Sequence, residues 1–290
     1  MRVLFILAIS CLSCIVFSQA PYVTFSADLN PQLRFDSRGH GKLYWYDDTG
    51  NYSRARLNVF LENDWVLRIR QKLARINNDP DNSGIDELFL ERASEWRFGK
   101  QYLPYGSNRI LKENGWSVRL DTELAFADLP LVISFTTNGK GRQQGVVLRI
   151  GDWFGISAAI GSHFGINATS FTQLQLPEEA LGTGRGYRFI YGLDVTRKFR
   201  ALQISGEYLQ MRRPHIFLDR EDDIVNLLVR YEFPFGPALE AEGTVATQSK
   251  RENLKISSQI PLSRELFLVP MAIFRKRTGT IYGISAQVRL

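Results

Sequence analysis

Cysteine and histidine are nearly absent from this 290-residue chain, which has two cysteines and three histidines. Cys11 and Cys14 lie within the first 20 residues, and His40, His163 and His215 fall in separate expected loops. No Cys/His cluster has metal-ligand spacing, so we expect no metal site and no cofactor.

Catalytic motifs are missing as well. The sequence contains no G-x-S-x-G elbow, no P-loop and no H-E-x-x-H. "GTGRG" at 182–186 is an isolated glycine-rich turn. Ser162 and His163 are the only neighbours that resemble the Ser and His of a lipid-facing phospholipase site, and no companion Asn or Asp accompanies them. We therefore expect a protein that is not an enzyme.

Long apolar runs are rare, and the one that stands out is at the N-terminus. Arg2 is followed by "VLFILAISCLSCIVF" and then by the small residues "SQA", which is typical of a secretory signal peptide and too short for a membrane span. We predict a signal peptide over 1–20, cleaved near 18–20, and one domain over 21–290. Because both cysteines leave with the signal, the mature chain must fold without disulfides, either by burial alone or in a membrane.

Charge of one sign does not dominate the chain. The formal net charge is +6, and it falls to +5 when Arg2 leaves with the signal, which is too small to indicate a nucleic-acid partner. With 44% hydrophobic and 23% charged residues, the composition is neither disordered nor collagenous.

Alternation of apolar and charged residues runs through nearly the whole mature chain. In "VNLLVRYEF", Val225, Leu227 and Val229 alternate with Asn226 and Arg230. This period of two predicts β-strands. We count fifteen strands between 53 and 290 and one more within 22–46, which gives about 16 strands, with a range of 14–18.

The connections alternate between short and long. Short turns are expected at 62–64, 92–94, 127–130, 151–153 and 234–236, and longer links at 77–85, 103–114, 162–185 and 212–221. In hydrocarbon a sheet must close on itself, and bacterial single-chain barrels have an even number of strands, short periplasmic turns and longer outer loops. The pattern therefore predicts an all-β fold, a transmembrane antiparallel β-barrel. Large aromatic residues at the turns suit the membrane interface: Trp65, Trp153, Phe154, Phe233 and Phe235.

Two other classes stay open. A secreted soluble β-sandwich that binds a ligand would also alternate, although it gives no reason for alternating loop lengths. A barrel that anchors or adheres without conducting would have a plugged lumen and functional outer loops. The longest predicted loop, 162–185, narrows a channel if it folds inward and forms a lid or adhesive surface if it folds outward.

The last strand and one internal motif resemble known outer-membrane proteins. "IYGISAQVRL" is similar to the C-terminal strand that the barrel-assembly machinery reads in Gram-negative bacteria, although Leu290 replaces the usual Phe or Trp. "GKQYLPYG" resembles a stretch of the sixteen-stranded porins of the phosphate-selective O/P type and related channels, with the match at Gly99, Gln101, Pro104 and Gly106.

The resemblance implies an outer-membrane location, a homotrimer and passive diffusion of small hydrophilic solutes. It also implies that the motif closes one strand and enters an outer loop. The lysine-rich loop of the phosphate-selective members is not found in this sequence.

Charged residues on the inner face would line such a channel, because a charge on the lipid face costs roughly 2–4 kcal/mol near the midplane. Basic residues are densest over 53–62 and 65–75, whereas acidic residues are spread, so we expect an anion preference. The open alternative is that these charges only solvate a wide lumen. The predicted pore-lining residues are Arg54, Arg56, Arg68, Arg70, Lys72, Arg97, Arg119, Arg149, Arg188, Arg230, Asp121 and Glu123.

Overall fold

The computed structural model describes residues 22–44, 53–73, 84–93, 95–111, 114–125, 127–137, 144–161, 188–212, 220–248, 250–276 and 279–290. Their regular structure is entirely β, and no helix in these ranges is long and apolar enough to cross a membrane. The segments are β1 (Tyr22–Leu29), β2 (Gln32–Phe35), β3 (Gly41–Tyr44), β4 (Arg54–Phe60), β5 (Trp65–Lys72), β6 (Ile85–Arg92), β7 (Trp96–Tyr102), β8 (Asn114–Leu124), β9 (Leu129–Thr137), β10 (Gln144–Gly151), β11 (Phe154–Gly161), β12 (Arg188–Phe199), β13 (Leu202–Arg212), β14 (Arg220–Glu232), β15 (Ala238–Ala246), β16 (Arg251–Pro261), β17 (Leu266–Arg275) and β18 (Gly279–Arg289).

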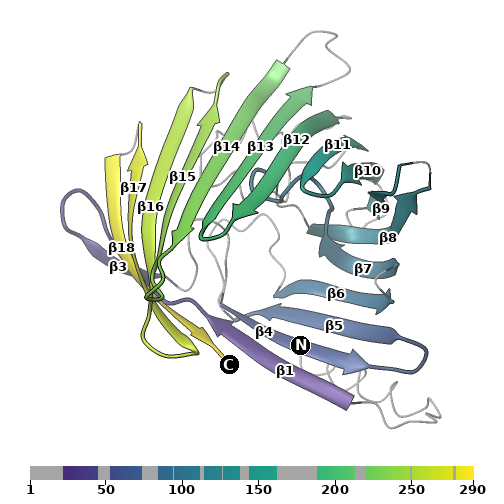
Figure 1. Cartoon of the computed structure of the whole chain (residues 1–290), viewed down its shortest axis with the longest axis horizontal. Helices are drawn as coiled ribbons and strands as arrows, with labels where there is room; N and C mark the ends of the chain where they lie inside the picture. Colours follow the sequence, from purple (N-terminus) through teal and green to yellow (C-terminus); the bar gives the residue numbers. More distant parts are fainter. Residues whose placement is uncertain are drawn as a thin grey trace.

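The eighteen segments form a closed antiparallel barrel of sixteen strands (Figure 1). β1 and β2 pair with β18 in one continuous register, from Asp28 opposite Arg289 to Phe35 opposite Tyr282, so they act as one strand. On the other side β1 pairs with β4 and β2 with β3. The break between β1 and β2 falls at Pro31, which has no N–H to give to a ladder. The predicted barrel and its strand number are confirmed.

Each strand has an apolar outer face, whereas the inner faces hold small or polar residues and, on β10 to β14, buried apolar residues as well. Along β11, Phe154, Ile156 and Ile160 are 44%, 54% and 39% exposed, whereas Ser157 and Ala159 between them are buried. The same alternation appears along β12 and β14. So many exposed large apolar side chains on one surface are unusual for a water-soluble protein and suit contact with lipid.

Short turns join the strands at one end of the barrel, where several residues have positive φ. Asp64, Ala93, Asp128 and Arg200 all have φ between 45° and 61°, which tight hairpins require. At the other end, β7 leads into the long connection that positions the candidate site. Three connections at that end are short as well: 36–40, 247–250 and 276–278.

Candidate functional site

The connection that follows β7 lies inside the barrel. We name residues 103–111 the inner loop, and Figure 1 shows it within the wall near β11 and β12. Two side chains on β13 and β11 hold its backbone: Glu207 accepts a hydrogen bond from Arg109 N at 2.9 Å, and Ser157 Oγ accepts one from Gly106 N at 3.0 Å. Glu207 also accepts one from Ser107 Oγ at 2.6 Å. The loop is therefore fixed across the lumen.

Apolar packing holds the same loop. Leu103, Tyr105, Ile110 and Leu111 are at most 2% exposed. Their partners are inward-facing residues of β10 to β15, namely Val147, Ala159, Ile190, Leu209, Met211, Ile224 and Ala246. Burying a side chain of this size stabilises a structure by about 1.5–3 kcal/mol, so the inner loop has a core of its own.

The four motif residues build the approach to this loop. Gly99 has φ 133°, and a Cβ there would collide with the backbone of β6. Gln101 is 1% exposed and its Nε2 lies 3.4 Å from Ser117 O. Pro104 is the second residue of the loop, and Gly106, with φ 51°, leaves room for the Glu207 carboxylate. The motif closes β7 and enters the connection that follows it, and this connection folds into the barrel because the apolar residues next to Pro104 and Gly106 pack against apolar side chains of the wall.

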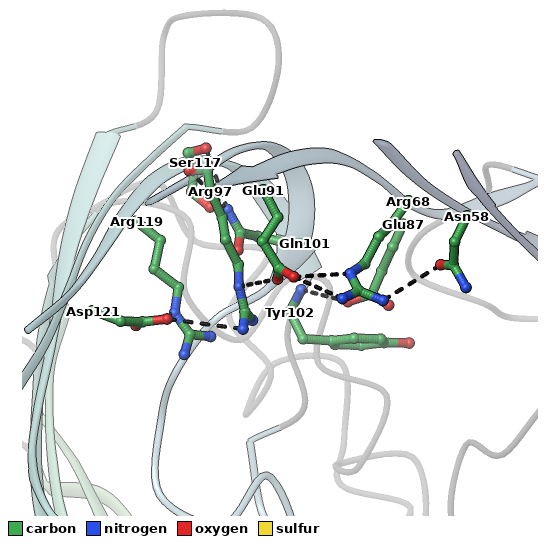
Figure 2. A network of polar contacts seen from close by, with 10 residues as sticks. All are labelled: Asn58, Arg68, Glu87, Glu91, Arg97, Gln101, Tyr102, Ser117, Arg119 and Asp121. Carbon is green, nitrogen blue, oxygen red and sulfur yellow. Dashed lines mark hydrogen bonds and ion pairs between the residues drawn. The ribbon is translucent and has the colours of Figure 1, made fainter. Parts of the chain in front are cut away.

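A chain of ion pairs covers the inner face from β5 to β8 (Figure 2). Arg68 Nη2 lies 2.7 Å from Glu91, whose other oxygen lies 2.8 Å from Arg97 Nε. Asp121 then joins Arg97 to Arg119, at 3.8 Å and 2.6 Å. We name these five residues the ion-pair chain. Its side chains are all less than 40% exposed, so part of each charge is shielded from bulk water.

Further predicted residues on β4 and β5 also have acidic partners. Lys72, the predicted residue at the end of β5, is buried, with 8% of its surface exposed. The pairs are Arg54 with Asp86 at 2.9 Å, Arg56 with Asp28, and Arg70 with Glu87. Sequence reasoning missed these three carboxylates. Asp86 and Glu87 are neighbours in the chain, so alternation assigns them to opposite faces, but a register shift opposite Arg70 and Gln71 places both beside arginines.

The remaining predicted residues lie farther around the wall. Arg149 pairs with Asp194 at 2.6 Å, and Arg230 lies 3.6 Å from Glu240. Glu123 is exposed near the short-turn end of β8. Arg188 begins β12, and its side chain is outside the described part.

Opposite the ion-pair chain, the wall behind the inner loop is acidic. Glu207 and Glu242 lie on β13 and β15, and Arg109 of the loop reaches Glu242 at 3.3 Å. The inner charges are thus unequally divided, with basic residues in excess over β4 to β8 and carboxylates in excess over β13 to β15. Such an arrangement produces a field across the lumen.

Several expectations concern segments outside the described residues. These are the signal peptide 1–20 with both cysteines, the loop 162–185, and the neighbours Ser162 and His163. The loop that lies within the barrel, 103–111, was expected only as an ordinary outer connection. The apolar residues Leu103 and Tyr105, next to Pro104 and Gly106, were the sequence signal that could have predicted an inward path.

Comparison with solved structures places this geometry in a known architecture. No protein-family model and no curated protein sequence matches the chain. The fold is that of the outer-membrane porins. In-vitro folded OmpT of Vibrio cholerae in its trimer form has a TM-score of 0.59 at 11% identity over 94% of this chain and 100% of that one. An anion-selective porin from Comamonas acidovorans has 0.59 at 11% over 93% and 99%. Salmonella typhi OmpF in complex with daunomycin has 0.56 at 11% over 95% and 99%.

Proposed function

We propose that this protein is a porin of the outer membrane of a Gram-negative bacterium, and that its water-filled channel lets small hydrophilic solutes diffuse passively. The inner loop carries the proposal, because a segment with its own core and four polar tethers narrows a lumen in a fixed way. Sixteen strands suit an aqueous channel rather than a filled barrel. The porin fold of the structural neighbours and the motif at Gly99 to Gly106 support the same function.

The predicted pore-lining residues would give this channel a weak anion preference. Basic side chains exceed acidic ones over β4 to β8, and rings of arginine favour anions. The preference is weak because most of these arginines have a carboxylate beside them. The structural neighbour from Comamonas acidovorans is anion-selective, which agrees with this choice.

The proposed partners follow from the same location. The outer face contacts outer-membrane lipid, and β18 presents the C-terminal strand to the barrel-assembly machinery. A homotrimer is proposed because the OmpT neighbour has a trimer form. Analytical ultracentrifugation of the detergent-folded protein tests this, and a monomer at all concentrations would contradict it.

Single-channel recording in planar bilayers tests the channel. Folded protein, identified by its heat-dependent gel migration, is reconstituted in a bilayer that separates two salt concentrations. We expect stable conductance steps and a reversal potential whose sign indicates a preference for anions. Arg68→Gln and Arg70→Gln should move that potential toward cation preference, because each removes an inner cation. Silence from folded, inserted protein would overturn the diffusion function and favour an anchoring or adhesive barrel.

A further inference from the structure

An arginine stacked on a tryptophan lies on the outer face of the barrel at the short-turn end. Arg197 Cζ is 3.7 Å from the centre of the Trp153 ring. Val195 of β12 is opposite Phe154 of β11, an outward-facing residue, so Arg197, two positions farther along, faces outward too. The backbone fixes the platform, since Trp153 O accepts a hydrogen bond from Thr196 N at 2.8 Å.

The surroundings combine charge with exposed apolar surface. Trp153, Phe154, Leu193 and Phe199 are 44–58% exposed around the guanidinium. Among the described residues, no carboxylate forms an ion pair with Arg197, whereas its neighbour Lys198 pairs with Glu232 at 3.0 Å. Arg197 therefore presents its N–H donors to whatever lies beside the outer face.

A second stack at the same end provides a contrast. Arg92 lies 5.9 Å from the centre of the Trp65 ring. The turn beside it contains Glu62 and Asp64, which would repel an anion. Around Arg197 the described residues include one exposed acid, Asp152 next to Trp153, and the turn beside Arg197 adds a second arginine, Arg200. The two arginines outnumber the acid, so the potential there favours a negatively charged group.

We propose that Arg197, Trp153 and the exposed apolar residues next to them bind one phospholipid, with the phosphate on the guanidinium and the acyl chains along Phe154 and Leu193. Guanidinium groups recognise phosphate oxygens with paired donors, and tryptophan places such a site at the depth of the headgroups. The aromatic platform also limits the rotamers of Arg197 before the lipid arrives, which lowers the entropy cost of binding. The site rests on the membrane insertion proposed above and is independent of conduction.

Native mass spectrometry of the full, detergent-folded chain with added phosphatidylglycerol tests the site. We expect one lipid to remain bound to the parent protein. Arg197→Gln should weaken that binding about fivefold, since a basic residue near a lipid surface contributes about 1 kcal/mol. Trp153→Leu should weaken it as well. Arg264→Gln, which removes an exposed arginine from the turn between β16 and β17, is the matched control and should retain the lipid.

Three outcomes would overturn the proposal. Equally tight lipid binding by Arg197→Gln and the parent protein would show that there is no site at Arg197. An equal loss in Arg264→Gln would show attraction by net charge alone. Displacement of the lipid by millimolar inorganic phosphate would identify a free-phosphate site. Each readout comes from folded protein and requires no conductance, so a silent channel that still binds the lipid would overturn only the diffusion function.

Discussion

Two halves of the inner wall differ in what covers their side chains: water and ion pairs on one half, and the inner loop on the other. From β4 to β8 the wall keeps its charges, and each acid neutralises one or two arginines, as Glu91 does with Arg68 and Arg97. From β10 to β15 the wall combines inward-facing apolar residues with carboxylates such as Glu207 and Glu242, and the inner loop packs against the apolar ones. The first half is polar and partly wet, whereas the second is a packed core inside a barrel.

The comparison suggests two separate roles: the charged part of the wall lines the lumen, and the part packed against the inner loop holds that loop in place. Packed side chains resist displacement, so the covered half determines where the inner loop lies. The carboxylates of the charged half are nearly buried, but their arginines are 10–39% exposed and keep contact with water. A substitution that keeps the side-chain volume, such as Glu to Gln, should therefore change the charge without loss of the fold. We therefore expect substitutions behind the loop to change the size of the channel and those on the ion-pair chain to change its selectivity.

The largest effect is expected from Leu111→Ala in the inner loop. Leu111 is 1% exposed, and truncation of such a residue costs about 2–5 kcal/mol. The loop should become susceptible to limited proteolysis, and the single-channel conductance should rise.

Leu227→Ala is the control for this substitution. Leu227 is on the outer face of β14 and 50% exposed, so its truncation should leave both readouts unchanged. Equal effects of the two substitutions would show that the inner loop has no core of its own.

A smaller effect is expected from Glu207→Ala. The change removes the acceptor of hydrogen bonds from Ser107 Oγ and Arg109 N, and leaving buried donors unpaired costs roughly 1–3 kcal/mol. The conductance should fluctuate between two levels as the loop leaves and regains its place. Glu207→Gln keeps an acceptor oxygen and should behave nearly as the parent does. If Gln fluctuates as much as Ala, charge rather than hydrogen bonding holds the loop.

On the charged half, Glu91→Gln should change selectivity and not size. It frees Arg68 and Arg97 from their shared partner, and an added unit charge about 8 Å from a passing ion changes its energy by roughly 0.5 kcal/mol at the permittivity of water, in opposite directions for anions and cations. The anion-to-cation permeability ratio, read from the reversal potential in a salt gradient, should rise by up to about fivefold. Glu123→Gln, at the exposed end of β8, should change it less. Conductance that changes more than the ratio would contradict the division between the two halves.

The smallest effect belongs to a carboxylate outside both halves. In the turn between β2 and β3, the His40 backbone N–H donates to Asp36 Oδ1 at 2.9 Å and holds the pKa of that carboxyl below its usual value. A lowered pKa in the folded state means that the contribution to the turn is present above pH 4 and is lost as the pH falls through the lowered pKa. Carboxyl-carbon NMR in micelles should show Asp36 titrating below pH 3.8, with conductance unchanged there. A midpoint at or above the ordinary value would contradict the turn geometry.

The sequence predicted the wall better than its contents. Alternation in segments such as 225–233 is a local property, and closure requires an even number of strands, so both the fold and the count of about sixteen followed. The path of the inner loop depends on contacts with strands from β10 to β15, which no local pattern encodes. The partners Asp86 and Glu87 were missed for a related reason, because a register shift interrupts the alternation that would have assigned them.

The pairing of the first strand with the last determines how the molecule must be assembled. Ala27 and Leu290 exchange backbone hydrogen bonds at 2.8 and 2.9 Å, although nearly the whole chain separates them. Contacts of such long range form slowly, and until they form the sheet has two free edges that can pair with other chains. Pairing of β18 with β1 and β2 therefore closes the sheet and removes the edges at which it can aggregate. Any delay in this pairing lengthens the time for which the unclosed sheet depends on chaperones.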